Sequence, residues 1–212
     1  MVQASVAPST WLNHGNKQVV VWLIGHSYLF WAARRAEIRP GGRNLGFTAA
    51  ALEWKGIRGM SWWQVLPEAV EISRRDRGPL VLVIHAAGND LCRSRLSDLM
   101  TLMKADISRI RGFFNEVVLV WSEIVPRVVW QGARDPAAIE RARRVVNTRI
   151  SRFVRSLGGV VIRHRQLEGD NRSLMRPDGI HLNEIGLDIF LSGLQDGIDQ
   201  ALFLLSGGRS SV

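Results

Sequence analysis

The chain has 212 residues, of which 46% are hydrophobic, and this length suits a single domain with one substantial core. Its 28 Lys and Arg against 19 Asp and Glu give a formal net charge of +9, which would attract nucleic acid, anionic membranes or acidic polymers without identifying any of them. Cys92 is the single cysteine, so an internal disulfide and a Cys/His metal framework are excluded, and no motif calls for a metal or another cofactor.

The first 17 residues show neither helical nor strand periodicity. We expect a flexible lead-in over residues 1–17, one domain over residues 18–206 and a short tail over residues 207–212. The lead-in lacks a basic start followed by a long apolar run, so no secretory signal is expected. No stretch reaches the roughly 18 apolar residues of a membrane-spanning helix. An intracellular protein, cytoplasmic or nuclear and without a transmembrane segment, is therefore predicted.

Short apolar runs alternate with segments of helical periodicity along the chain. Strands are predicted over residues 19–24, 47–54, 79–85, 117–121 and 160–162. Helices are predicted over residues 27–36, 62–72, 96–110, 137–157 and 183–205, the last of them bent near Gly193 or Gly197. Because parallel strands need crossover connections, this alternation predicts an α/β fold whose parallel sheet has helices on both faces.

Four polar segments follow predicted strands or precede the last helix. They are Gly25-His26-Ser27, Ile57-Arg58-Gly59, Gly88-Asn89-Asp90 and the run from Asp178 to Asn183. The carboxyl ends of parallel strands share one edge of a sheet, so residues far apart in sequence can meet there. We expect these segments to meet over one substrate.

The residue types in these segments fit nucleophilic catalysis. A serine hydroxyl needs a neighbouring base, and His181 is a candidate to take the proton of Ser27 while Asp178 orients the imidazole. The backbone N–H groups of Ser27 and Gly59, with the side-chain amide of Asn89, would serve as donors to the developing oxyanion.

Each of these residues also has a purely structural interpretation. Ser27 or Asn89 would cap the helix that follows it, and Gly59 would permit a tight turn. Asp178 would hold a turn, and His181 would be an ordinary loop histidine. Only their order and placement together favour a catalytic site.

In this order and placement the motifs resemble those of the SGNH hydrolase superfamily, also called GDSL-type esterases and lipases. The four family blocks have matches here: Ser27 in GHSY, Gly59 in GIRGMS, Asn89 in AAGND, and the pair Asp178 and His181 in DGIHLN. Gly56 is an alternative to Gly59 for the glycine block. The resemblance spans about residues 19–205. It implies a flavodoxin-like three-layer α/β/α sandwich with about five parallel strands. It also implies a cofactor-free serine esterase that hydrolyses carboxylic esters.

The chain departs from the family at one position, because His26 stands where the family usually has Asp in GDS. A titratable imidazole beside Ser27 would alter the pH dependence or the arrangement of the oxyanion loop. The GHSY form, the Trp31-Ala32 pair and the run SEIVPR are similar to the esterase-like domains of some vertebrate retrotransposons and their domesticated relatives.

Three further residues are candidates for a substrate wall: His26, Arg127 and Trp130. Arg127 and Trp130 follow the fourth predicted strand and would reach the same edge, where Arg127 would clamp an anionic group. In the structural alternative Arg127 pairs with Glu123 and Trp130 covers the core. Short acyl esters, acetyl above all, are the expected substrates. The natural ester, whether a lipid, a sugar or a modified protein, stays open.

The helix predicted over residues 137–157 is basic. Its apolar residues are expected to pack inward, while its arginines face water. These arginines are Arg141, Arg143, Arg144, Arg149, Arg152 and Arg155. Such a basic face is also a candidate binding surface for nucleic acid or anionic lipid. The alternative function is therefore a catalytically weak or inactive module of the same fold that binds nucleic acid or an anionic membrane.

Overall fold

The computed structural model describes residues 18–74 and 78–208. The predicted lead-in over residues 1–17 and the end of the predicted tail, residues 209–212, lie outside the described residues.

Five parallel strands form the centre of the fold, as the alternating pattern predicted. They are β1 (Val19–Gly25), β2 (Ala50–Gly56), β3 (Val81–His85), β4 (Val118–Ser122) and β5 (Val160–Ile162). Their order in the sheet is β2-β1-β3-β4-β5. The second strand begins at Ala50 rather than Phe47, because residues 42–48 form a 3₁₀ turn and an irregular loop. The Asn44 side chain helps to hold this loop, since it contacts the carbonyl oxygens of Phe47 and Ala50.

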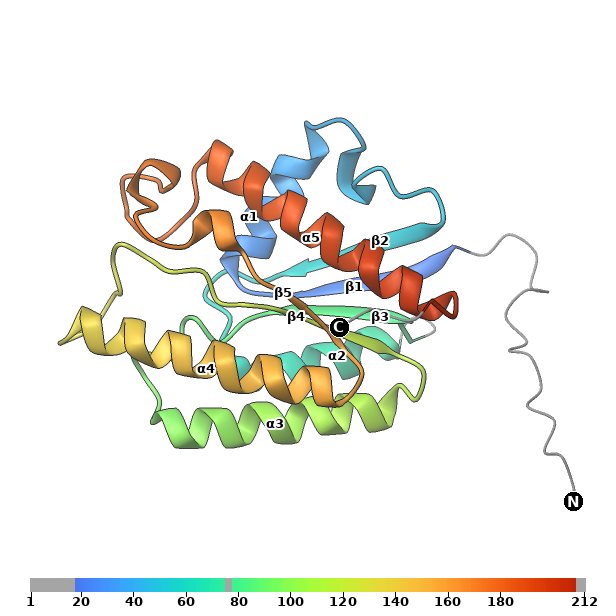
Figure 1. Ribbon diagram of the computed structural model, residues 1–212, viewed down its shortest axis with the longest axis horizontal. Coiled ribbons are helices and arrows are strands. Elements are labelled where there is room, and N and C mark those ends of the chain that lie inside the picture. Colours follow the sequence, from blue (N-terminus) through green and yellow to red (C-terminus); the bar gives the residue numbers. More distant parts are fainter. Residues whose placement is uncertain (1–17, 75–77, 209–212) are drawn as a thin grey trace, which may run out of the picture.

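Two layers of helices cover the sheet. The helices are α1 (Ser27–Glu37), α2 (Val65–Ser73), α3 (Leu96–Phe113), α4 (Pro136–Ser156) and α5 (Glu184–Leu205). Figure 1 shows α1 and α5 above the sheet and α2, α3 and α4 below it, which is the predicted three-layer sandwich. In residues 18–74 and 78–208, no helix combines the length and the apolar character needed to cross a bilayer.

The interior strand β1 contributes to the core on both faces of the sheet. Val21 and Leu23 pack with α1 and α5, whereas Trp22 and Ile24 pack on the side of α2 and α3, and all four side chains are fully buried. Burial of each such side chain contributes roughly 1.5–3 kcal/mol. An uncharged apolar run is therefore the sequence that a strand covered on both faces requires.

The last helix runs unbroken from Glu184 to Leu205, and its glycines allow close packing on the sheet. A Cβ atom on Gly197 would lie 2.3 Å from Cγ1 of Ile162, and one on Gly193 would lie 3.0 Å from Nδ1 of His164. These glycines therefore bring α5 close to β5 and the loop that follows it.

The strand register brings the predicted site segments to one edge. Gly25 pairs with Gly56 on one side and with His85 on the other, and Ser27, Gly59 and Asn89 follow these three positions within a few residues. The connections from β1 and β3 lead to opposite sides of the sheet. Open α/β sheets bind ligands at such a point of reversal, beyond the carboxyl ends of the strands.

Candidate active site

Ser27 is the first residue of α1 and follows the end of β1 by two positions. The N-cap of α1 is His26, not Ser27, because Nδ1 of His26 accepts a hydrogen bond from the backbone N–H of Tyr28 at 3.4 Å. The imidazole thus supplies the cap acceptor that a carboxylate would supply in a GDS sequence. The Ser27 hydroxyl is left free for another partner.

That partner is His181, in the loop before α5. Oγ of Ser27 lies 3.1 Å from Nε2 of His181, and Nδ1 of His181 lies 2.7 Å from Oδ2 of Asp178. The other carboxylate oxygen of Asp178 accepts the backbone N–H groups of Ile180 and His181 at 2.8 and 2.9 Å. Gly179 between them has φ +64°, so the loop turns tightly enough for Asp178 and His181 to meet. The three predicted residues form one hydrogen-bonded chain.

The surroundings of Asp178 favour its ionised form. Partial burial by itself would raise the pKa of Asp178, but the backbone N–H and imidazole of His181, with the N–H of Ile180, lower that pKa to about 2. The loop is further anchored to α1, because the Tyr28 hydroxyl donates to the carbonyl of Ile180 at 2.7 Å. Burial raises the pKa of Tyr28 to about 12, so this phenol stays a hydrogen-bond donor at neutral pH.

The three residues predicted to supply oxyanion donors, Ser27, Gly59 and Asn89, all line one cavity. Within the described residues, the backbone N–H groups of Ser27 and Gly59 donate no hydrogen bond. Nδ2 of Asn89 donates one hydrogen to the carbonyl of Met60 at 2.9 Å, which leaves its second hydrogen unused. Gly59 has φ +75°, a conformation that favours glycine. These three groups stay the predicted donors to an oxyanion.

The rival glycine has a structural role. A Cβ atom on Gly56 would lie 2.2 Å from the backbone nitrogen of Phe30, so Gly56 lets the end of β2 pack against α1. Gly56 is not among the residues that line the cavity, whereas Gly59 is.

Arg127 lies beside Asn89 in the loop after β4. Both its terminal nitrogens lie 3.2 Å from Oδ1 of Asn89, and its guanidinium carbon lies 5.7 Å from the ring centre of Tyr28 and 5.1 Å from that of Trp130. Gly88 makes room for it, since a Cβ atom there would lie 3.0 Å from Nη2 of Arg127.

The alternative pairing of Arg127 with Glu123 does not occur. Glu123 instead accepts a hydrogen bond from the hydroxyl of Ser151 at 2.7 Å. Arg127 and Trp130 both line the cavity, and Trp130 is also buried against the core, so its role as a substrate wall stays a prediction.

The cavity over Ser27 has a volume of about 430 Å³, which is the size of a small-molecule site. Its lining residues are Ser27, Arg58, Gly59, Gly88, Asn89, Cys92, Arg93, Arg127, Trp130, Gln131, Ile180 and His181. The loops that carry Gly59 and Asn89 also supply Arg58, Cys92 and Arg93, which the sequence motifs did not single out. No group of three or more His, Cys, Asp or Glu side chains in the described part of the chain is arranged to hold a metal ion.

His26 does not line the cavity, so its prediction as a wall residue is corrected. Its side chain is buried behind Gly88, where a Cβ atom would lie 3.2 Å from Nε2 of His26. Burial above all, and then the fields of His85, Arg127 and His181, hold the pKa of His26 well below its usual range. His26 therefore shapes the loop before Ser27 as a neutral ring.

A chain of buried histidines lies close to His26. The ring centres of His26 and His85 are 4.7 Å apart, Nδ1 of His85 lies 2.9 Å from Oγ of Ser122, and the same oxygen lies 2.8 Å from Nε2 of His164. Burial, followed by the field of His164, lowers the pKa of His85 well below its usual value, and burial lowers that of His164 to about 3. Sequence spacing did not link these residues, because they come from different strands and loops.

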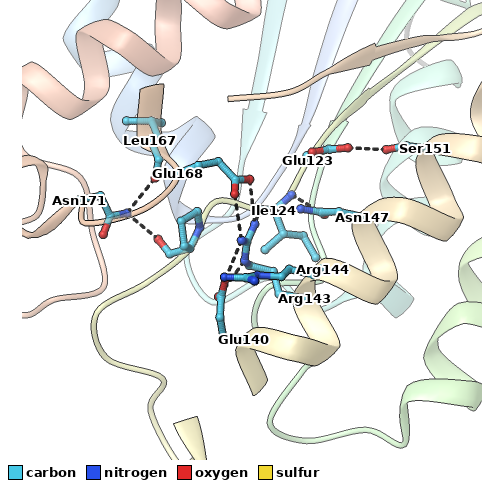
Figure 2. A network of polar contacts seen from close by, with 11 residues as sticks. Glu123, Ile124, Glu140, Arg143, Arg144, Asn147, Ser151, Leu167, Glu168 and Asn171 are labelled. Carbon is cyan, nitrogen blue, oxygen red and sulfur yellow. Dashed lines mark hydrogen bonds and ion pairs between the residues drawn. The ribbon is translucent and has the colours of Figure 1, made fainter. Parts of the chain in front are cut away.

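The basic helix α4 departs from prediction at Arg143, which is 1% exposed rather than facing water. Its guanidinium lies 2.7 Å from Glu140 and 3.4 Å from Glu168, and it donates to the carbonyl of Ile124 at 2.7 Å. Figure 2 shows Arg143 between Glu140, Glu168 and Ile124, the last of which lies in the loop after β4. Arg141 and Arg144 also form ion pairs, so the surface available to an anionic polymer is smaller than expected.

Two asparagines hold the same loop from either side. Asn147 brackets Ile124, with its amide nitrogen 2.9 Å from the Ile124 carbonyl and its amide oxygen 2.9 Å from the Ile124 N–H (Figure 2). Asn171 donates to the carbonyl of Pro126 at 3.1 Å. The backbone that precedes Arg127 is therefore fixed on both sides.

No protein-family model matches the sequence, and no curated protein matches it. Solved structures do match the fold, among them eight at 11–18% sequence identity. A GDSL-like lipase from Bacteroides thetaiotaomicron is 17% identical, with a TM-score of 0.70 over 86% of this chain and 88% of that one. The family 3 carbohydrate esterase of Clostridium thermocellum is 18% identical, with a TM-score of 0.68 over 89% and 100% of the two chains.

A psychrotrophic esterase from Pseudoalteromonas is 14% identical, with a TM-score of 0.66 over 86% of this chain and 98% of that one. The fold is that of the SGNH hydrolases. The SGNH fold agrees with the three-layer architecture expected from the motifs. The narrower resemblance to the retrotransposon-borne domains is not tested by these structures and stays a prediction.

Proposed function

We propose that the protein is a serine esterase that hydrolyses carboxylic esters with short acyl groups. The observation that carries this proposal is the continuous chain from Oγ of Ser27 through His181 to Asp178, with distances of 3.1 and 2.7 Å, at the wall of a cavity. The esterases and lipases among the matched structures are consistent with it.

In the first half of the reaction Oγ of Ser27 bonds to the ester carbonyl carbon, and its proton passes to Nε2 of His181. Asp178 holds the imidazole in the required tautomer and balances its positive charge. The carbonyl oxygen becomes an oxyanion, for which Ser27 N–H, Gly59 N–H and Asn89 Nδ2–H are the candidate donors. The C–O bond to the alcohol then breaks, and the alcohol leaves with the proton from His181.

In the second half a water molecule gives a proton to His181 and its oxygen attacks the acyl carbon. The acid is released and Ser27 regains its proton. The cavity of about 430 Å³ suits a short acyl group such as acetyl.

A fluorophosphonate probe tests whether Ser27 is an activated nucleophile. We expect labelling of the wild-type protein at Ser27, located by mass spectrometry of its peptides, and none in Ser27→Ala. Labelling in Ser156→Ala should equal the wild type, because Ser156 is exposed on α4 and bonded only to the carbonyl of Phe153. Absence of a label on Ser27 in folded wild-type protein would contradict the proposal.

The alternative of a weak or inactive module that binds nucleic acid or an anionic membrane is not favoured by a specific observation. The basic face that motivated it is reduced by the burial of Arg143 and the ion pairs of Arg141 and Arg144.

A further inference from the structure

We propose that this cavity prefers esters whose acyl or alcohol part carries an anionic group, bound by the guanidinium groups of Arg58 and Arg93. The proposal deepens the esterase function proposed above and rests on it. It concerns a second set of contacts, separate from the triad and the oxyanion donors.

Three arginines from three different loops line the cavity that contains Ser27 and His181. Arg58 follows β2, Arg93 follows β3 and Arg127 follows β4. None of the described residues that line the cavity is Asp or Glu. The walls around the reacting atoms thus carry positive charge from several directions, which focuses an attractive field on an anionic ligand.

The charge of these arginines is not cancelled by ion pairing. Across residues 18–74 and 78–208, ten other lysine and arginine side chains form salt bridges with carboxylates, whereas Arg58, Arg93 and Arg127 have no described carboxylate within 4.0 Å. Asp90 lies within the field of Arg93: burial raises the pKa of Asp90, and the Trp62 N–H and then Arg93 lower it in part. Asp90 itself is occupied, because it accepts the backbone N–H of Trp62 at 2.9 Å.

The three arginines have different tasks. Arg127 donates hydrogen bonds to Oδ1 of Asn89, so it adds positive charge to the cavity while its guanidinium is held in place. Arg58 and Arg93 are exposed at the cavity and donate no hydrogen bond to a described side chain. The guanidinium carbon of Arg58 lies 5.9 Å from the ring centres of both Phe30 and Trp31, which holds it near the cavity while leaving its N–H groups available.

A carboxylate, phosphate or sulfate fits these donors. Guanidinium groups bind such planar or tetrahedral oxyanions through charge-assisted, often paired, hydrogen bonds. A neutral ester would leave Arg58 and Arg93 with only water. Each charge-assisted bond that forms in the transition state should favour the anionic ester about tenfold in kcat/KM.

The test uses two matched pairs of esters that place the anion on opposite sides of the scissile bond. On the acyl side, the para-nitrophenyl monoester of glutarate is compared with para-nitrophenyl pentanoate. On the alcohol side, para-acetoxybenzoate is compared with its neutral methyl ester. The ratio of kcat/KM within each pair is measured for the wild type, Arg58→Gln, Arg93→Gln and the control Arg149→Gln. Arg149 is exposed on α4 and does not line the cavity.

We expect the anionic ester to be favoured about tenfold or more in at least one pair by the wild type and Arg149→Gln. The ratio should fall toward one in Arg58→Gln and Arg93→Gln. The pair that shows the preference identifies the side of the ester that carries the anion. Ratios near or below one in both wild-type pairs, or ratios that neither cavity variant changes, would overturn the proposal.

A binding measurement separates this proposal from the esterase function. Calorimetric titration of Ser27→Ala with the same intact esters should show tighter binding of the anionic member, and this difference should vanish when Arg58→Gln or Arg93→Gln is added. If no ester is hydrolysed but this difference is found, the esterase function fails and the anion subsite stands. If the esters are hydrolysed without any difference in rate or binding, the subsite fails and the esterase function stands.

Discussion

Both terminal nitrogens of Arg127 lie 3.2 Å from Oδ1 of Asn89. A guanidinium that donates twice to one amide oxygen fixes which end of the Asn89 amide it faces. Nδ2 is thereby directed to the other side, where it donates to Met60 and keeps one hydrogen for the cavity. We infer that Arg127 positions the Asn89 donor for the oxyanion.

Replacing Arg127 by lysine should expose this positioning role. Lysine keeps the charge but cannot make two parallel donations from one planar group. We expect kcat on para-nitrophenyl acetate to fall about tenfold to a hundredfold, with a smaller change in KM, since a misplaced oxyanion donor affects the transition state most. Steady-state kinetics at equal folded fraction measure this, and a change confined to KM would contradict the role.

A double-mutant cycle with Asn89→Ala separates positioning from a general structural effect. Asn89→Ala alone should lower kcat about 10²- to 10³-fold, as loss of one oxyanion donor does. In the Asn89→Ala background, Arg127→Lys should lower kcat only slightly further, because the amide that Arg127 orients is absent. Full additivity of the two losses would show that Arg127 acts independently of Asn89.

Asp178→Asn should lower kcat by up to about 10⁴-fold with little change in KM, because an amide cannot hold His181 in the required tautomer or balance its charge. The pKa of about 2 keeps Asp178 ionised at pH 4 and above, so the loss should be seen across pH 5–8. Asp170→Asn is the control, since Asp170 is exposed and pairs only loosely with Arg172 at 3.9 Å. A wild-type rate in Asp178→Asn would refute the triad.

Acid should weaken the fold through His164, because burial lowers the pKa of this side chain from the ordinary histidine value to about 3. The unfolded chain binds a proton near pH 6.5 and the folded chain does not. The stabilisation is therefore complete above about pH 6.5 and is lost progressively as the pH falls toward 3.

Urea unfolding of the wild type and His164→Gln at several values between pH 7.5 and pH 5 measures this dependence. The wild-type free energy of unfolding should fall more steeply, by up to about 1.4 kcal/mol per pH unit. The decisive quantity is the difference between the two proteins in the slope of unfolding free energy against pH. Asp90, whose pKa is raised, adds stability as the pH falls, and it does so in both proteins. Equal slopes would mean that His164 takes up its proton in the folded state.

Arg143→Met should destabilise the protein by about 3–5 kcal/mol, because it removes the buried cation that Glu140 and Glu168 share and one of the two donors to the Ile124 carbonyl. Arg144→Met is the matched control. Arg144 also pairs with Glu140, but its side chain is 70% exposed, so the loss should stay under about 1 kcal/mol. Denaturant unfolding measures both, and similar losses would contradict a structural role for Arg143.

The sequence predicted most of the sheet and the reacting residues for a shared reason. Apolar runs such as Val19–Ile24 signal buried strands directly, and parallel strands bring Ser27 and Asn89 to one edge without further information. The spacing of Asp178 and His181 likewise lets a single loop carry both.

What the sequence did not predict depends on contacts between distant segments. Nothing local distinguishes Arg143 from Arg144, and only the approach of the loop after β4 buries the first and leaves the second in water. His26 looked like a wall residue because it adjoins Ser27, yet the turn into α1 directs neighbouring residues to opposite sides.

The most direct test of the account is the hydrolysis of para-nitrophenyl acetate by the wild type, Ser27→Ala and Ser156→Ala, purified identically. We expect turnover by the wild type and Ser156→Ala, and a rate for Ser27→Ala that is lower by about 10³-fold or more. Equal rates in the wild type and Ser27→Ala, with both proteins folded, would show that Ser27 is not the nucleophile.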